Sequence, residues 1–530
     1  MTTESQIGLG MKANSDDEVL TFRREMGTIS RQSGVFFLGA IFTAALGYAF
    51  RVYLARVLGA EALGIYALGM TVVGLVGIFG GLGLTSAASR FALVYSGSGR
   101  LEDLRSFLVW SILSLAGVNG LFVLGVVFAR HWLATTLYHT PSLVNYLLLF
   151  GLIMFVGTLT NFFGQLLQGY KQVAKRTLIT NFVGAVLAMA FTVVLVGLGT
   201  GLWGYIFAQL ASAVVVLILL ALTSYRLTPG AARVSFRPVH FPPREVLSFA
   251  AAAFVMDVMG FLYTQTDKVI LGVYLDARSV GIYAVAATII QFLPIALQSV
   301  NQIFSPTIAD LHARGEAAML NRLFQTLTKW VAGLTLPLVA VVVIFSRVLM
   351  RIFGHDFEVG WTILVIGSVG QLVNCAVGSV GYLLLMSGNQ KRLVRIQAVT
   401  AVVTVGCCLL MVPRWGLAGA AIATALGNAG SNAWCLWEVK RVLGLFPYTR
   451  SYLRLTLPAL ASVAAAVGLR IALRSVSPDI LMVILAAAAV YAVFIGAVLM
   501  AGLEADDRLI ASAIWSRVRN FLPDPPAGIA

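Results

Sequence analysis

Residues 246–283 read VLSFAAAAFVMDVMGFLYTQTDKVILGVYLDARSVGIY, a long apolar run that carries Asp257, Asp267 and Lys268, then a short turn and a second apolar run. A helix needs about 20 residues to cross a bilayer, and an ionisable group at that depth costs roughly 2.5–3.5 kcal/mol on insertion scales. Such groups must face a partner or a wet cavity. Asp257 and Lys268 fall within about 40° of each other on a helical wheel, so the stretch predicts a membrane helix with one polar face.

The composition of the whole chain also indicates a membrane protein. Of the 530 residues, 59% are apolar and 11% are charged, and the mean hydropathy is +0.90. A water-soluble fold of this size would not carry that composition on its surface. The net charge of +15 comes from short basic clusters between apolar runs, which argues against a nucleic-acid partner.

The apolar runs predict an all-α polytopic membrane protein with about fourteen transmembrane helices. Residues 34–225 form an N-lobe of six helices, residues 246–437 form a C-lobe of six, and residues 453–503 hold two more. Residues 226–245 contain four prolines and predict a linker. Residues 1–33 are a polar N-terminal tail, and residues 504–530 are a C-terminal tail. The predicted spans are 34–57, 64–90, 105–129, 142–168, 177–197, 202–225, 246–274, 280–308, 328–350, 359–386, 394–412, 416–437, 453–473 and 479–503.

The distribution of Lys and Arg predicts the orientation, because short basic loops stay in the cytoplasm. With the N-terminus inside, the inner segments hold 27 basic residues and the outer loops hold 8. Both tails and the linker are therefore expected in the cytoplasm. Residues 1–33 contain no apolar core followed by a small-residue cleavage site, so no cleavable signal peptide is expected.

Cysteine and histidine spacing predicts neither a metal site nor a cofactor. The four cysteines lie inside apolar segments without a CxxC spacing, and the five histidines are scattered over loops. The cysteines are interpreted as small core residues. They are Cys375, Cys407, Cys408 and Cys435.

An internal repeat relates the two predicted lobes. Residues 51–67 read RVYLARVLGAEALGIYA and residues 268–284 read KVILGVYLDARSVGIYA, an offset of 217 residues that also aligns residues 164–167 with 381–384. A repeat of six helices is even, so the two copies have the same orientation in the membrane. Transporters built in this way hold substrate between two lobes and alternate access by rocking them. Duplication in a channel or an enzyme is the alternative.

These patterns resemble a known family. GYAFRVYLARVLGAEALGIYAL, its echo TDKVILGVYLDARSVGIYAVA and the late GLAGAAIATALGNAG are similar to oligosaccharide flippases of the multidrug/oligosaccharidyl-lipid/polysaccharide exporter superfamily, over roughly residues 34–440. The resemblance implies a protein without enzymatic activity. It would move polyprenyl-diphosphate-linked sugar units across the bacterial cytoplasmic membrane for O-antigen, capsule or exopolysaccharide synthesis. Fourteen spans are typical of these flippases, and twelve are typical of the multidrug exporters.

A lipid-linked sugar diphosphate presents negative charges and hydroxyl groups, so cations in a wet cavity suit it. Lys268 and its repeat mate Arg51 lie toward the outer ends of their spans, and Arg90 lies at the inner end of the second span. These three are the candidate substrate-binding residues. Snorkelling of the long side chains to the interface is the alternative for each.

Four further polar residues are candidates for a coupling-ion or sugar contact. Asp257 lies near the middle of its span, where an unpaired carboxylate tends to take up a proton, and Asp267 adjoins Lys268. Gln165 and Gln291 are placed to line a cavity. A structural ion pair for Asp257, and hydrogen bonds between helices for the glutamines, are the alternatives.

Three other functions compete with the flippase. A drug/cation antiporter of the same superfamily would rely on carboxylates such as Asp257 and would have fewer spans. An integral-membrane glycosyltransferase or polymerase would carry catalytic residues in a sizeable outer loop, whereas the longest outer loops here offer only Asp356 and Glu358 as acids. A scaffold without transport is the third. The expected partners are the lipid-linked oligosaccharide, the bilayer, and a polymerase with glycosyltransferases, and a monomer of two fused lobes suffices.

Overall fold

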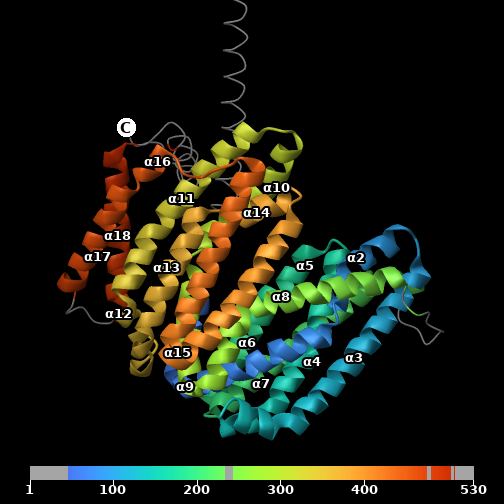
Figure 1. Ribbon diagram of the computed structural model, residues 1–530. Coiled ribbons are helices and arrows are strands. Elements are labelled where there is room, and N and C mark those ends of the chain that lie inside the picture. Colours follow the sequence, from blue (N-terminus) through green and yellow to red (C-terminus); the bar gives the residue numbers. More distant parts are fainter. Residues whose placement is uncertain (1–45, 233–240, 242, 474–478, 503–506, 508–530) are drawn as a thin grey trace, which may run out of the picture. The chain divides into compact units, whose positions relative to one another are not determined.

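In the computed structural model the chain is helical, with no strand among the residues that it describes, 46–232, 241, 243–473, 479–502 and 507 (Figure 1). The all-α prediction is confirmed. The predictions for the tails 1–33 and 504–530, apart from Asp507, and for residues 233–240 and 242 of the linker lie outside the described residues.

The described helices include 11 that are long and apolar enough to cross a membrane, or 12 if α9 (Ala277–Phe292) and the start of α10 (Ile295–Ala313), bent by 50°, form one span. Fourteen were predicted. The count differs because two pairs of predicted spans each fall in one continuous helical segment, Leu46–Gly81 and α15 (Gln390–Leu443). Each segment contains a glycine with positive φ, Gly59 at 80° and Gly416 at 53°.

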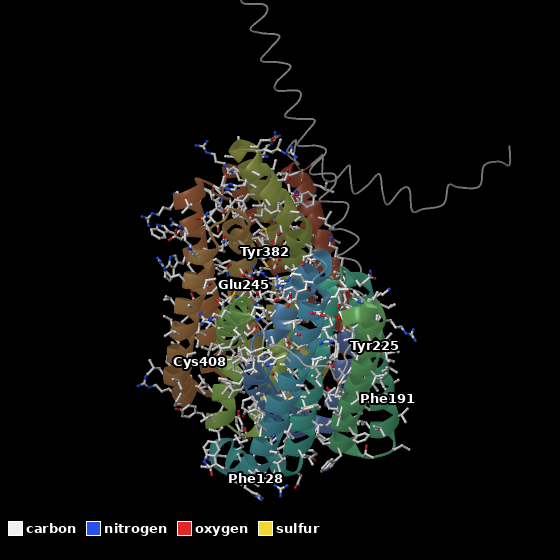
Figure 2. All side chains as sticks on the ribbon, turned by 90° about the vertical axis from the view of Figure 1, so that its right-hand side faces the viewer. Phe128, Phe191, Tyr225, Glu245, Tyr382 and Cys408 are labelled. Carbon is white, nitrogen blue, oxygen red and sulfur yellow. The ribbon has the colours of Figure 1, made fainter. Side chains whose placement is uncertain are left out.

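Apolar side chains cover the outside of these helices, as a lipid-facing surface requires. On α3 (Leu101–His131), Leu121, Leu124 and Phe128 follow one another at intervals of about one turn and are all exposed. Phe128 is 85% exposed and lies at the periphery (Figure 2). In water such a stripe would promote association, so the surface confirms a membrane protein.

One compact unit comprises Tyr53–Ala284 and Val405–Ala420. Its core is aromatic: the rings of Phe91 and Phe107 lie 5.9 Å apart, and those of Phe107 and Phe162 lie 6.5 Å apart. These three side chains come from three helices, so the core joins α2, α3 and α4. The remaining elements of this unit are α2 (Leu84–Gly97), η1 (Trp132–Leu137), η2 (Pro141–Asn145), α4 (Leu147–Gly169), α5 (Val173–Thr177), η3 (Leu178–Val183), α6 (Gly184–Gly197), α7 (Gly201–Leu227), η4 (Gly230–Ala232) and α8 (Arg244–Tyr274).

Helix α8 packs with the helices of the first half, although the repeat groups it with the second. A Cβ atom added to Gly83 would lie 1.9 Å from the carbonyl oxygen of Ala250, so glycine is needed for the close approach of α8. Nearby, the rings of Phe79 and Phe254 are 5.7 Å apart. The compact unit therefore includes α8 and continues to Ala284. The predicted division into lobes at residues 226–245 stays a prediction, based on the sequence repeat.

The second membrane helix is broken. The segment Leu46–Gly81 ends at Leu82 and Gly83, whose φ angles are 50° and 66°, and α2 begins at Leu84. A break inside a membrane leaves backbone groups that need other partners. The buried amide of Asn119, on α3, donates to the carbonyl oxygen of Gly80 at 2.9 Å and accepts from the Thr158 hydroxyl at 3.1 Å. Asn119 thus stabilises the break from the neighbouring helix.

The two copies of the repeat touch each other at equivalent residues of this unit. A Cβ atom on Gly64 would lie 1.6 Å from the Ala277 carbonyl oxygen, and one on Gly281 would lie 2.1 Å from the Ala60 carbonyl oxygen. Ala60 and Gly64 are four residues apart, as are Ala277 and Gly281. Pairs of small residues at this spacing let membrane helices approach until their backbones touch. The motif in the first repeat copy therefore packs directly against the same motif in the second repeat copy.

The other compact unit comprises residues 46–52 of the described chain, Val285–Thr404 and the described residues from Ala421 onward. Its core lies between α10, α11 and α14, where Phe304, Phe324 and Leu384 are fully buried. Its further elements are α11 (Ala317–Ile344), α12 (Ser346–Arg351), η5 (His355–Gly360), α13 (Trp361–Val377), α14 (Val380–Met386), most of α15, α16 (Arg450–Leu453), α17 (Thr456–Ala472) and α18 (Asp479–Ala501).

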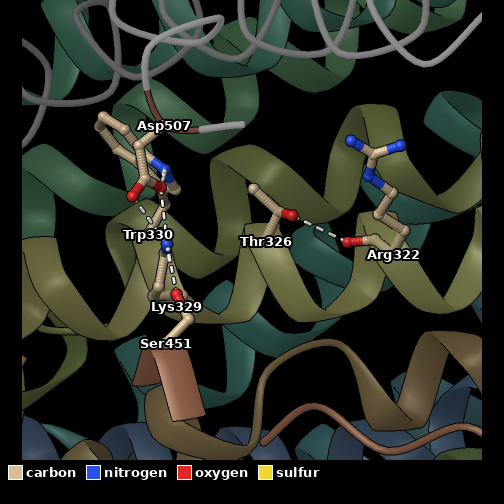
Figure 3. A network of polar contacts seen from close by, with 6 residues as sticks. All are labelled: Arg322, Thr326, Lys329, Trp330, Ser451 and Asp507. Atoms are coloured by element: carbon tan, nitrogen blue, oxygen red, sulfur yellow. Dashed lines mark hydrogen bonds and ion pairs between the residues drawn. The ribbon is translucent and has the colours of Figure 1, made fainter. Parts of the chain in front are cut away.

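Helices α17 and α18 pack on α11, and two ion pairs form with residues at the start of α18 and after its end. Lys329, on α11, lies 2.7 Å from Asp507, and both side chains are only 12% and 11% exposed. The Lys329 ammonium also donates to Ser451 at 2.9 Å, and the Trp330 indole donates to Asp507 at 3.0 Å (Figure 3). Beyond the far end of α11, Arg351 donates twice to Asp479 at 2.7 Å, which raises the pKa of the guanidinium.

Candidate functional site

Asp267 and Lys268 are neighbours on α8, but their side chains do not pair with each other. The Lys268 ammonium donates to the side-chain oxygen of Gln265 at 2.7 Å. Asp267 accepts from the Tyr283 hydroxyl at 2.8 Å and from the backbone N–H of Lys268 at 2.8 Å. Tyr283 belongs to the repeated GIYA motif, so the carboxylate ties α8 to α9. Among the described residues Lys268 thus has a neutral amide and no carboxylate as its side-chain partner.

Asp257 is an exposed side chain on α8 that has no hydrogen-bond or ion-pair partner within the described part of the chain. Its neighbours Val255 and Met256 are also exposed. A carboxylate at this depth needs a proton, a cation or water. Its predicted role as a coupling-ion or sugar contact stays a prediction.

Arg51 lies in the other compact unit, near the start of the helical segment Leu46–Gly81, whose residues from Tyr53 onward belong to the first unit. Its guanidinium donates to the hydroxyl of Thr288, a buried residue of α9 in the same unit. Thr288 joins the helix of the first repeat copy to that of the second. The repeat mates Arg51 and Lys268 therefore both donate to neutral side chains.

Arg90 lies in the middle of α2, with an exposed side chain. Its guanidinium carbon is 4.7 Å from the ring centre of Phe249 on α8 and 5.7 Å from that of Phe91. Stacking on an aromatic face orients the planar guanidinium while leaving its N–H groups free to bind an anion such as a phosphate. This geometry is compatible with the predicted phosphate contact.

The two predicted glutamines differ in position. Gln165 is half-buried on α4, and Gln291 is exposed near the end of α9. Neither has a side-chain hydrogen bond to another described residue. Within their compact unit, Lys268 and Asp267 bond to Gln265 and Tyr283, and among its described residues no side-chain hydrogen bond links either of them to Arg90, Asp257 or Gln165.

A polar pocket lies between α4 and the α5–η3 segment, with a volume of about 410 Å³. Arg176 is the charged residue in its wall. The other lining residues are Gly157, Thr160, Asn161, Gly164, Val173, Thr177, Thr180 and Asn181. Most of these are polar, which is unusual for the surface of membrane helices, where polar groups usually line a wet cavity.

The local sequence explains how the pocket forms. Gly164 lets the Arg176 side chain lie against α4, because a Cβ atom there would be 3.3 Å from Nε. One nitrogen of the guanidinium then donates to the side-chain oxygen of Gln168. The segment η3 is a π-helix, a wide helical turn that is frequent at functional sites. It places Thr180 and Asn181 in the same wall as Arg176.

Sequence analysis missed this pocket. It named Gln165 on the same helix but gave no role to Arg176, Asn161 or Asn181. A signal was present: Gly157, Thr160, Asn161 and Gly164 recur at helical spacing and mark one small, polar face of α4. This helical spacing on α4 does not predict that α5 forms the opposite wall of the pocket.

Comparison with known proteins identifies relatives. A family model described as polysaccharide biosynthesis protein matches residues 29–312, more than half of the chain. A probable low-salt glycan biosynthesis flippase, Agl15 of Haloferax volcanii, is 21% identical over 187 residues, which cover 35% of this chain and 40% of the relative. The chain thus matches less than half the length of that relative.

Solved structures share the fold. The lipid II flippase MurJ in an inward closed conformation superposes with a TM-score of 0.68 at 16% identity, over 87% of this chain and 98% of that one. An inward-facing multidrug resistance MATE family transporter of the MOP superfamily superposes with a TM-score of 0.63 at 15% identity, over 75% and 94%. At these identities the likeness shows the fold alone.

Proposed function

Because the chain belongs to the polysaccharide biosynthesis protein family, we propose that it is a flippase that moves polyprenyl-diphosphate-linked oligosaccharide units across a membrane by alternating access. The proposal places it in the bacterial cytoplasmic membrane with both termini in the cytoplasm, and its product goes to surface polysaccharide. Agl15, a flippase by name, and the fold of the lipid II flippase support this reading.

The environment of Lys268 carries the proposal. A lysine ammonium inside a membrane helix requires an anionic or polar partner. Here the ammonium is bonded to Gln265 at 2.7 Å, while the adjacent carboxylate is engaged by Tyr283 at 2.8 Å. The positive charge is therefore available to an anion such as a diphosphate. Arg90, stacked on Phe249 and exposed, offers a second cation of the same kind.

The contact between the repeat copies suggests how access alternates. Gly64 and Gly281 lie at the starts of the predicted spans 64–90 and 280–308, which the basic-residue distribution assigns to the outer side. Their close approach would close that side, and access from outside would require the two motifs to separate. The contact between Gly64 and Gly281 is formed by backbone atoms and contains no long interlocked side chains. It can therefore open and close reversibly.

A drug/cation antiporter is the second candidate. Asp257 favours it, because an exposed carboxylate without a partner among the described residues suits a cationic substrate or proton. The MATE fold is shared as well. The balance of charges favours the flippase, since the described pocket is lined by an arginine and no carboxylate. A polymerase and glycosyltransferases are proposed partners that consume and supply the substrate, and a monomer is proposed to suffice.

A deletion and rescue experiment in the host tests the flippase. Cells without the gene are expected to accumulate lipid-linked sugar units on the inner side and to lose surface polysaccharide. Wild type and Lys391→Ala, a change at an exposed lysine of α15, should rescue, whereas Lys268→Ala should not. Normal surface polysaccharide together with new sensitivity to cationic drugs would support the antiporter instead.

A further inference from the structure

We propose that the pocket between α4 and the α5–η3 segment is a binding site for a phosphate group that carries neighbouring hydroxyls, as in a polyol phosphate or a sugar diphosphate headgroup. The inference deepens the proposed flippase function and rests on it for the identity of the transported ligand. The chemistry of the pocket itself is argued from its donors, its charge and its size.

The pocket wall is rich in hydrogen-bond donors that are not used by the protein. A guanidinium has five N–H donors, and Arg176 uses one nitrogen for Gln168. Asn181 accepts the Thr180 hydroxyl at 2.9 Å through its carbonyl oxygen, which orients its NH2 group as a donor without a partner in the described residues. Asn161, on the opposite wall, is exposed and has no side-chain hydrogen bond there either.

The charge around the pocket is positive and uncompensated. The sequence contains no Asp or Glu between Asp103 and Glu245, so the helices α4 to α7 carry no carboxylate side chain. Lys171 and Lys175 are exposed at the connection between α4 and α5. With no acid on these helices, Arg176 attracts an anion and repels a cationic drug.

The size and the lining select among anions. At about 410 Å³ the pocket falls in the roughly 300–1,000 Å³ range of small-molecule sites, and it exceeds what a single inorganic ion needs. Arginine binds phosphate oxygens in pairs, and Asn and Thr side chains suit sugar or polyol hydroxyls. A charged group flanked by hydroxyls therefore matches the wall better than a fatty acid carboxylate.

The position agrees with loading from the inner leaflet. Gly164 and Arg176 lie within two turns of the basic connection between α4 and α5, which the orientation rule assigns to the cytoplasmic side. A headgroup in the inner leaflet could thus enter the pocket while its lipid tail stays in the bilayer.

The test is direct binding to the purified full-length chain in phosphatidylcholine nanodiscs. One probe is a short-chain polyprenyl-diphosphate-linked N-acetylglucosamine, and the second is phosphatidylglycerol, an anionic polyol phosphate. Arg176→Gln should weaken binding of one or both probes at least tenfold. Arg226→Gln, the same change at an exposed residue of α7 in the same unit, should alter affinity less than twofold.

The two probes separate the sources of the phosphate. Arg176-dependent binding of the diphosphate sugar assigns the pocket to the transported substrate, and Arg176-dependent binding of phosphatidylglycerol alone assigns it to membrane lipid. If Arg176→Gln does not fold, Asn181→Leu, at an exposed residue, replaces it, with an expected loss of at least fivefold. Unchanged affinity of both probes for a folded variant overturns the inference.

The outcome is independent of the flippase proposal. Arg176-dependent binding together with normal export in the deletion strain would retain the pocket and reject the flippase. Loss of export on deletion, with Arg176→Gln binding and exporting like wild type, would retain the flippase and reject the pocket.

Discussion

Gly64 and Gly281, equivalent residues of the two repeat copies, lie with their backbones in contact: a Cβ atom on Gly64 would be 3.1 Å from the nitrogen of Gly281, and one on Gly281 would be 2.8 Å from the nitrogen of Gly64. The relation is nearly reciprocal, as expected where one motif meets its own duplicate about a local two-fold axis. Such packing tolerates no side chain at either position.

Replacing Gly281 by leucine should therefore separate the two helices. Overpacking of this kind costs about 1–3 kcal/mol, so the thermal unfolding midpoint in detergent should fall by several degrees, and export should drop at least tenfold. Gly125→Ala is the control, because nothing lies within 4 Å of a Cβ atom there. A Gly281→Leu protein with the stability and export of wild type would contradict the contact.

The hydrogen bonds of Asn119 predict an effect on stability. Asn119→Leu removes the side-chain donor to the buried Gly80 carbonyl at the helix break, whereas the Thr158 hydroxyl keeps its bond to the Met154 carbonyl oxygen at 3.0 Å. A buried polar group that loses its partner costs about 1–3 kcal/mol. The unfolding midpoint should fall clearly more than for Asn145→Ala, an exposed residue of η2. Equal midpoints would show that the break does not depend on Asn119.

The Lys329–Asp507 pair predicts a non-additive double-mutant cycle. Removing one partner of a buried pair leaves a charge without compensation and typically costs about 3–5 kcal/mol. Lys329→Met and Asp507→Leu should each lower the unfolding midpoint, and the double variant should recover part of the loss. The exposed pair of Arg100 and Asp103, 53% and 40% exposed, is the comparison and should contribute less than about 1 kcal/mol. Additive effects at Lys329 and Asp507 would argue against the pair.

Sequence periodicity predicted the helices and the repeat because both depend on local residue order. The GIYA motifs were aligned from the sequence, and the structure adds that Gly64 and Gly281 touch. Hydropathy could not reveal that α8 packs with the first-half helices, because the lipid-facing and most protein-facing sides of a membrane helix are both apolar. The close approach of Gly83 to Ala250 depends on how two helices pack against each other, and the sequence of either helix alone does not specify it.

The polar sites were predicted only in part, for a related reason. Ionisable residues inside spans are conspicuous, so Asp257, Asp267 and Lys268 were named from the sequence. Their hydrogen-bond partners were not predicted, because nothing in the sequence distinguishes Gln265 and Tyr283 from other polar residues before the fold brings them into contact. Arg176 was missed because a basic residue near the end of a span resembles an interface anchor.

The central claim is transport of a lipid-linked oligosaccharide, and reconstitution measures it most directly. Proteoliposomes containing the purified chain and a fluorescent short-chain polyprenyl-diphosphate-linked sugar would be assayed with a membrane-impermeant reagent, under proton, sodium and potential gradients in turn. The account predicts translocation at least tenfold faster than in protein-free vesicles under one of these conditions, retained by Lys391→Ala and reduced to background by Lys268→Ala. A wild-type protein no faster than protein-free vesicles under every gradient would contradict it.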